Sequence, residues 1–188
     1  IAVEIQETFF TAMKVAFFGG FIISLPVIFW QLWLFLAPGL YDHEKKLVVP
    51  FVFFATLMFL LGASFAYYIV VPVGFDFLIA FGNSVVSVLP SIGKYVGFFT
   101  KLLIGFGIAF ELPVITFFLA KIGLVNDQML KDFFRYAVVL IFIVAAVLTP
   151  PDVISQVLMA APLLILYGVS IYIAKVFNSA QKEEEEEE

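Results

Sequence analysis

The sequence contains no cysteine and a single histidine among 188 residues, so it has neither a disulfide framework nor a set of ligands for a metal ion. It also lacks a His-Glu-x-x-His helix, a Gly-x-Ser-x-Gly turn and a glycine-rich phosphate loop. Charged residues are scarce, at 13% of the chain, and many of the acids lie in the terminal run Glu183 to Glu188. The residues that metal-dependent catalysis and nucleotide hydrolysis require are therefore missing. We therefore expect a protein that is not an enzyme and needs no cofactor.

Apolar residues dominate what remains. They make up 63% of the chain, with 25 phenylalanines and a mean hydropathy of +1.11. A soluble domain of this length cannot bury so much apolar surface. Runs such as Phe51 to Leu61 are apolar on every face, and the alternating polarity of a membrane β-barrel is absent. The composition predicts an all-α integral membrane protein with several spans.

Five apolar stretches are long enough to be read as spans, approximately at residues 10–36, 47–71, 95–120, 133–148 and 153–176. The fourth is brief and the fifth contains Pro162, so we expect two short C-terminal spans. The rather apolar residues 72–94 predict a short helix at the membrane interface. Asn126 fits a helix cap before the fourth span. The acidic residues 177–188 are of low complexity and are expected to form a disordered tail.

Basic residues divide unequally between the two sides of these spans, which predicts the orientation. The larger set is Lys45, Lys46, Lys121, Lys131, Arg135, Lys175 and Lys182, and the smaller set is Lys14, Lys94 and Lys101. The positive-inside rule places the larger set, and with it the C-terminus and the acidic tail, in the cytoplasm. Five spans then leave the N-terminus outside. Because the sequence begins with Ile1, we expect an upstream segment with one more span.

Glu111 is the most unusual residue of the apolar stretches. Ten positions separate it from Lys101 and ten from Lys121, which places it about 15 Å from each polar boundary of a hydrocarbon core about 30 Å thick. A carboxyl group at that depth is costly and indicates a functional site that faces a protein interior or a watery cavity. The alternative is a neutral carboxyl that is hydrogen-bonded to a neighbouring helix. Pro113 is expected to bend the same span.

Three motifs occur in order along the chain. They are Phe-Leu-Ala-Pro-Gly-Leu-Tyr-Asp-His-Glu-Lys-Lys at 35–46, Phe-Gly-Ile-Ala-Phe-Glu-Leu-Pro at 106–113 and Leu-Thr-Pro-Pro-Asp-Val-Ile-Ser-Gln at 148–156. With this hydropathy pattern the chain resembles TatC, the polytopic subunit of the twin-arginine protein translocase, without its first span. The resemblance implies a glove-like, concave bundle of six spans in the cell inner membrane. It also implies a receptor and assembly core that is driven by the proton-motive force.

The resemblance implies a signal-peptide site in the first of these motifs. Glu44 is expected to bind the paired arginines of the signal peptide, next to Phe35, Pro38, Leu40 and Tyr41. A carboxylate accepts two parallel hydrogen bonds from an arginine, and lysine cannot reproduce that geometry. The alternative is that Glu44 is a solvated carboxylate at the start of a helix, which is the usual role of an acid there.

The other two motifs imply contacts with partner proteins. On the concave face, Glu111 is expected to hydrate the interior or to meet a polar residue of a partner's transmembrane helix. Thr149, Asp152 and Gln156 are expected to organise the outer turn and its contacts with partners. From the residues alone, Asp152 is a helix cap and has a mainly structural role, and Gln156 has a weaker partner role. The expected partners are signal peptides of folded cargo, TatB-like and TatA-like single-span subunits, further copies of the chain and membrane lipid, with no nucleic acid.

A second functional class stays open at this stage. A proton-coupled secondary transporter would also place a carboxyl group such as Glu111 in mid-membrane, as a proton relay. That class is expected to show inverted repeats and paired broken helices, and neither is found in the sequence. The sequence therefore favours the receptor over the transporter.

Overall fold

The computed structural model describes residues 5–36, 48–83, 91–149 and 153–187, and every regular element in these ranges is a helix. In chain order the elements are α1 (Glu7–Leu36), α2 (Val48–Phe65), η3 (Ala66–Val70), α3 (Val71–Asn83), α4 (Ile92–Ala109), α5 (Glu111–Lys121), α6 (Asp127–Leu148) and α7 (Val153–Glu187). The prediction of an all-α helix bundle is confirmed.

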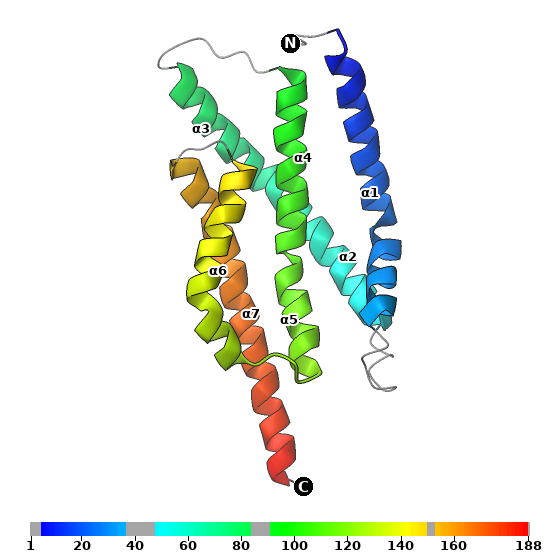
Figure 1. Cartoon of the computed structure of the whole chain (residues 1–188), viewed down its shortest axis with the longest axis vertical. Coiled ribbons are helices and arrows are strands. Elements are labelled where there is room, and N and C mark those ends of the chain that lie inside the picture. The colour runs from blue at the N-terminus through cyan, green and yellow to red at the C-terminus, as the bar shows by residue number, and fades with distance from the viewer. Residues whose placement is uncertain (1–4, 37–47, 84–90, 150–152, 188) are drawn as a thin grey trace.

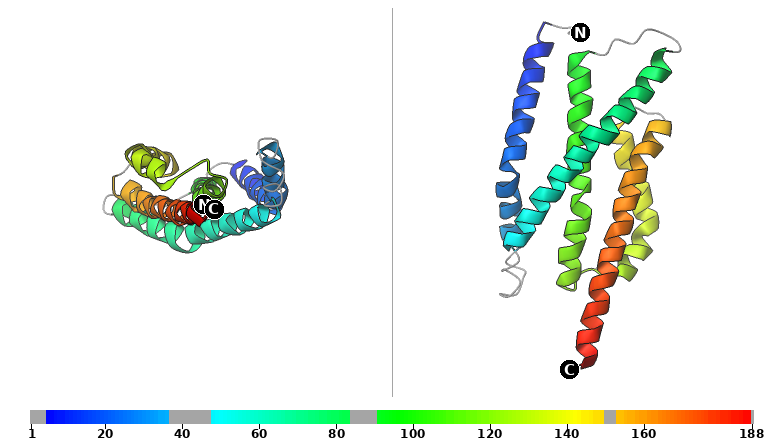
Figure 2. Two further views of the ribbon diagram at one scale, coloured as in Figure 1. Left: turned by 90° about the horizontal axis from the view of Figure 1, so that it is seen from below. Right: turned by 180° about the vertical axis from the view of Figure 1, so that it is seen from behind.

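The helices run through the bundle in alternating directions (Figure 1). One end of the bundle carries the start of α1, the end of α3 and the start of α4. The opposite end carries the end of α1, the start of α2 and the end of α5. Seen along the bundle, α1 and α6 lie at the two edges of a bowed layer, and α2 and α3 form its back (Figure 2). This bowed layer agrees with the concave arrangement that the family resemblance implies.

Helices α2 and α3 form one continuous, tilted helix instead of a span followed by a separate interfacial helix (Figure 2). Pro72 has no backbone N–H and cannot donate to the carbonyl four residues earlier. The chain widens just before it into the π-helical turn η3, where the N–H of Val71 donates to the carbonyl of Ala66. The short helix predicted within residues 72–94 therefore exists, but it begins as an extension of the second span.

Four stretches of the described chain are long and apolar enough to cross a membrane: Glu7–Phe35, Val48–Asp76, Ile92–Lys121 and Gln156–Asn178. Helix α6 coincides with the remaining predicted span and has 22 residues. Its first turns carry Asp127, Lys131, Asp132 and Arg135. Its apolar part begins only at Tyr136 and measures about 20 Å, which is shorter than a bilayer core of about 30 Å. The count of five spans stays a prediction.

Helix α7 is longer than the sequence suggests, because it extends from Val153 through Glu187 with Pro162 inside it. The acidic tail at 177–188, which we expected to be disordered, is thus helical as far as Glu187. Alanine, glutamine, lysine and glutamate all have high helix propensity, and the segment contains neither glycine nor proline to stop the helix. A low-complexity composition alone does not separate such a helical extension from a disordered tail.

The core extends through the whole bundle, and part of it is formed by α1, α2 and α4. Leu25, Phe59, Leu102 and Phe106 are almost fully buried there. Helix α4 approaches α2 closely at Gly107, where an added Cβ atom would lie 2.6 Å from the Phe59 ring. A Cβ atom added at Gly62 of α2 would likewise lie 2.5 Å from the backbone carbonyl oxygen of Phe106. Small residues permit such close packing, which is how helices associate in lipid without a hydrophobic driving force. This packing fixes the position of α4, and with it the start of α5.

The turn from α5 to α6 sets the course of the C-terminal pair of helices. Gly123 has a φ of +73°, in the left-handed region that glycine adopts without strain. The Asn126 side chain then accepts a hydrogen bond of 2.8 Å from the N–H of Met129, as an N-cap does. The cap that the sequence predicts at Asn126 is confirmed.

Candidate functional site

Glu111 is the first residue of α5 and follows a local break in the membrane helix. Pro113 cannot donate a hydrogen bond to the carbonyl of Ala109, so α4 ends at Ala109 and α5 begins at Glu111. The intervening Phe110 still donates from its N–H to the carbonyl of Phe106, at 2.9 Å. The two helices continue in nearly one direction (Figure 1). The bend expected at Pro113 is thus a break in the hydrogen-bond ladder, and it places Glu111 at a helix N-terminus, where the dipole favours a carboxylate.

The Glu111 side chain is buried, and no hydrogen bond of good geometry satisfies it within the described ranges. Only 5% of the residue is exposed, and its position ten residues before Lys121 places it about 15 Å from that end of the span. Neither carboxyl oxygen has a partner at hydrogen-bond distance and angle there, although the backbone of Phe59 on α2 lies close enough to act on the carboxyl group. The alternative that a neighbouring helix satisfies this carboxyl group therefore stays a prediction, with Phe59 as the candidate partner. Buried polar groups are nearly always satisfied, so the exception needs a reason.

Glu111 lines a cavity of about 250 Å³ between α1, α2 and α5, which we call the Glu111 cavity. Its lining residues are Phe29, Leu32, Trp33, Phe51, Glu111, Ile115, Phe118, Leu119, Ile122 and Leu124. Trp33, Phe51 and Phe118 form an aromatic cluster in its wall, with ring centroids 4.9 to 5.7 Å apart. The walls are thus almost wholly apolar around one carboxyl group.

Trp33 provides a second unsatisfied group in the same cavity. It is 4% exposed, and its indole Nε1–H has no acceptor among the residues with described positions. Within the described chain, two residues with unsatisfied polar atoms therefore line a single cavity, and these atoms are buried in its wall. Sequence reasoning missed Trp33, because its helix is apolar on every face and no spacing links it to Glu111.

Phe35 is the part of the predicted signal-peptide site that the structure describes. It lies in the last turn of α1, two positions after Trp33, and is 83% exposed. The predicted site therefore begins at the same end of α1 as the Glu111 cavity. The other predicted members, Pro38, Leu40, Tyr41 and Glu44, lie outside the described residues, so their geometry is untested.

The outer turn between α6 and α7 contains side chains that already have partners. The Thr149 hydroxyl donates to the carbonyl of Ala145 at 2.9 Å, within its own helix. The Gln156 Nε2 donates to the carbonyl of Phe142, also at 2.9 Å, and joins the start of α7 to the end of α6. Both contacts are structural, and a role in partner binding stays a prediction. Asp152 lies outside the described residues.

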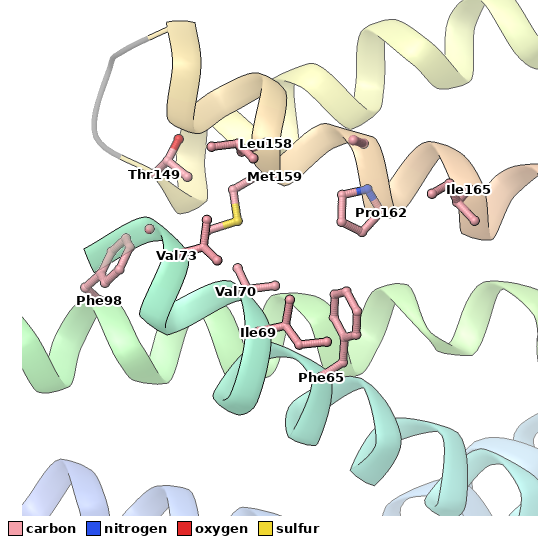
Figure 3. A pocket seen from close by; sticks show the side chains of 12 residues that line it. Phe65, Ile69, Val70, Val73, Phe98, Thr149, Leu158, Met159, Pro162 and Ile165 are labelled. Atoms are coloured by element: carbon pink, nitrogen blue, oxygen red, sulfur yellow. The ribbon is translucent and has the colours of Figure 1, made fainter. Parts of the chain in front are cut away.

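A second cavity, of about 280 Å³, lies beside this turn (Figure 3). Val70 and Val73 face Met159 and Pro162 of α7 across it, and Thr149 lies at its edge. We call it the Thr149 cavity. None of the unsatisfied side-chain atoms found in the described chain lines it. It shares no lining residue with the Glu111 cavity, so the structure does not bring the second and third motifs into one site.

Comparisons with known proteins agree with this architecture. Residues 1–162 match the family model of TatC, the Sec-independent protein translocase protein. The chain belongs to the TatC family. TatC of Campylobacter jejuni is 59% identical over 187 residues, covering 99% of this chain and 76% of that protein. TatC of Helicobacter pylori strain J99 is 56% identical over 179 residues, covering 95% of this chain and 72% of that protein.

Solved structures show the same fold. A crystal structure of the twin arginine translocase receptor TatC in the detergent DDM superposes with a TM-score of 0.84 at 41% sequence identity. The match covers 93% of this chain and 78% of that one. TatC proteins are components of a protein translocase and form no enzyme family. The chain is accordingly a multi-pass membrane protein and a subunit of the Tat protein translocase.

Proposed function

We propose that this TatC-family chain is the receptor and assembly core of twin-arginine export. It binds Arg-Arg signal peptides of folded proteins on the cytoplasmic side and recruits TatB-like and TatA-like single-span subunits, and the proton-motive force drives the transport. The observation that carries the proposal is the Glu111 cavity, where Glu111 and Trp33 have no partner among the described residues. Helices associate in lipid through packing and polar contacts. A partner helix with a polar side chain at this depth would supply both.

The signal peptide is assigned to the end of α1 next to this cavity. Glu44 binds the arginine pair through two parallel hydrogen bonds, and Phe35, Pro38, Leu40 and Tyr41 provide the adjoining surface. The exposed ring of Phe35 supports this assignment, because it is open to apolar or cation–π contact. The two similar crystal structures are of a protein that is named the twin arginine translocase receptor. By the positive-inside rule this end of the bundle and the C-terminus lie in the cytoplasm and the chain lies in the inner membrane.

Peptide binding tests the receptor role. Detergent-solubilised protein is titrated with an Arg-Arg signal peptide and with the same peptide carrying Lys-Lys. We expect tighter binding of the Arg-Arg peptide and loss of that preference in Glu44→Gln. Glu111→Gln serves as the matched control, because it removes a carboxyl group that lies within the membrane. This variant should bind both peptides as the parent protein does. Equal binding of the two peptides by the parent would contradict the proposal.

The transporter alternative rests on the same buried carboxyl group, which would suit a proton relay. Proton flux into liposomes that contain only this protein separates the two functions. The receptor proposal expects no solute-dependent flux from the isolated chain and a defect of Glu111→Gln only in the complete translocase. Solute-dependent proton uptake that is abolished in Glu111→Gln would favour the transporter.

A further inference from the structure

Two lysines of the membrane helices have no counter-charge within the described chain. Lys14 lies in the third turn of α1 and Lys101 in the third turn of α4. Both are exposed, and neither forms an ion pair or a hydrogen bond with any residue whose position is described. An ammonium group close to hydrocarbon is costly, and such groups normally pair with an acid or reach the membrane interface. These lysines are not part of the Glu111 cavity.

A contact at one end of the bundle shows that the two lysines lie at similar depth. The Glu7 carboxylate accepts a hydrogen bond of 2.7 Å from the N–H of Gly93, which brings the starts of α1 and α4 to one level. Seven positions separate Glu7 from Lys14, and eight separate Gly93 from Lys101. At about 1.5 Å per residue, the two lysine backbones lie about 10 and 12 Å below that contact.

Both lysines line one groove of about 660 Å³ between α1 and α4. The groove is lined by Phe10, Met13, Lys14, Phe17, Phe18, Phe21, Gly97, Thr100, Lys101 and Ile104. Phe17, Phe21 and Ile104 follow the lysines along their helices, so they lie deeper in the membrane. The groove thus has two cations midway along it and an apolar floor below them.

The depth of the lysines fits the phosphate layer of a bilayer. Lys101 lies ten positions before Glu111, so its backbone is about 15 Å from the membrane centre and at the boundary of a hydrocarbon core about 30 Å thick. The contact between Glu7 and Gly93 places Lys14 at a similar level. A lysine side chain that extends from this boundary toward the interface reaches the level of the lipid phosphates.

We propose that the groove between α1 and α4 binds an anionic phospholipid. The phosphate lies between Lys14 and Lys101, and one acyl chain follows the apolar floor along Phe17, Phe21 and Ile104. Two like charges that face one groove repel each other in a medium of low dielectric constant, and a single anion between them removes that repulsion. Basic pockets between membrane helices favour anionic headgroups for this reason. A zwitterionic lipid with the same chains lacks the net charge.

Competition between two lipids tests the headgroup. The protein is incorporated into nanodiscs that hold equal amounts of phosphatidylglycerol and phosphatidylcholine with identical acyl chains, and native mass spectrometry counts the lipids that stay bound. We expect enrichment of phosphatidylglycerol, reduced about fivefold by each of Lys14→Gln and Lys101→Gln and further in the double variant. Lys94→Gln is the matched control, because Lys94 lies at the same end of α4 but does not line the groove. Equal retention of the two lipids by the parent, or unchanged enrichment in the double variant, would overturn the proposal.

A filling variant tests whether lipid occupies the groove on the headgroup side of the lysines. A Cβ atom at Gly97 would meet nothing within 4 Å, so the side chain of Gly97→Leu begins in open space within the groove, and both lysines stay in place. We expect this variant to lose the bound phosphatidylglycerol, whereas Gly168→Leu, at an equally open position on α7, keeps it. Full retention in Gly97→Leu would show that no lipid occupies the groove beside Gly97, and a crosslink from Phe17 to another protein segment instead of lipid would show that no acyl chain follows the apolar floor.

Discussion

The two edges of the bundle differ in whether their buried polar groups have hydrogen-bond partners. Between α6 and α7, the Tyr167 hydroxyl donates to the carbonyl of Leu130 at 2.9 Å, and Gln156 donates to the carbonyl of Phe142. Between α1, α2 and α5, Glu111 and Trp33 have no partner within the described chain. An unsatisfied polar group costs several kcal/mol in lipid, where no water replaces the missing partner. The first edge uses polar groups to hold helices together, and the second leaves them open to a ligand.

This contrast separates stability from function. Removing a polar group that has a hydrogen-bond partner should lower the free energy of unfolding, and transport should fall only in proportion to that loss of stability. Removing an unsatisfied group should leave the stability unchanged or raise it, while transport falls. The predictions below follow this distinction, in order of decreasing expected effect.

The largest effect is expected for Glu111→Leu. The substitution removes a buried carboxyl group that has no partner and keeps an apolar side chain in the cavity, so the thermal unfolding temperature in detergent should stay the same or rise. Translocation into inverted membrane vesicles should fall about tenfold or more, since a hydrogen bond to a charged carboxylate contributes about 1.5 to 3 kcal/mol. Signal-peptide binding should be unchanged. A much lower unfolding temperature together with lower transport would mean that Glu111 supports the fold.

Trp33→Phe sharpens the comparison, because it keeps an aromatic ring near Phe51 and Phe118 but removes the indole N–H. The loss of one neutral hydrogen bond to a partner corresponds to about 1 kcal/mol, or about fivefold in partner binding. Partner binding can be measured by co-purification at graded expression of the single-span subunit. Unchanged binding would remove Trp33 from the site and leave Glu111 alone in it.

Much of this difference between the two edges of the bundle cannot be predicted from the sequence. Hydropathy located the helices of the bundle, and Asn126 marked a helix cap that the structure confirms. Pro113 was expected to bend its span, and the structure shows a break in the hydrogen-bond ladder at that place instead. The residues at those positions act on their own backbone, so local chemistry is sufficient. The face of a helix is different, because helices such as α1 and α2 are apolar all round and carry no periodic pattern to show which side meets which neighbour.

The candidate site, too, could be predicted from the sequence only in part. Glu111 was predicted because a charge in an apolar run is conspicuous in any sequence. Its pairing with Trp33 in one cavity depends on how α1 packs against α5, and no local signal encodes that packing. The continuity of α2 with α3 was also missed, because Pro72 normally ends a helix and here a π-helical turn absorbs its missing N–H.

On the other edge of the bundle, Tyr167→Phe is expected to lower the free energy of unfolding by about 1 kcal/mol, because it leaves the ring in place and removes one hydrogen bond. Transport at a temperature well below unfolding should be unchanged. Gln156→Leu serves as the companion variant, since its side chain also donates to a backbone carbonyl. A transport defect in Gln156→Leu that exceeds its loss of stability would instead support the predicted partner role of Gln156.

The smallest effect is expected at Asp127. Hydrogen bonds from Lys131 and Asn178 hold the pKa of this carboxyl below its ordinary value of 3.8. A lowered pKa means that the contribution to stability is present above the ordinary value and is lost as the pH falls through the lowered one. The difference in stability between the parent and Asp127→Asn should therefore be constant from pH 7 to about pH 5 and should shrink in stronger acid. Unfolding curves at several pH values measure this difference in stability. A difference that grows in acid would contradict the lowered pKa of Asp127.

Cysteine crosslinking measures the central claim most directly, because the chain has no native cysteine. One cysteine is placed at Ile115, in the Glu111 cavity, or at Ile165, in the Thr149 cavity, and is paired with cysteines scanned through the membrane helix of a single-span subunit. The account predicts a strong crosslink from position 115 that disappears with Glu111→Leu, and at most a weak one from position 165. Equal crosslinks from both positions, or a crosslink from position 115 that survives Glu111→Leu, would contradict it.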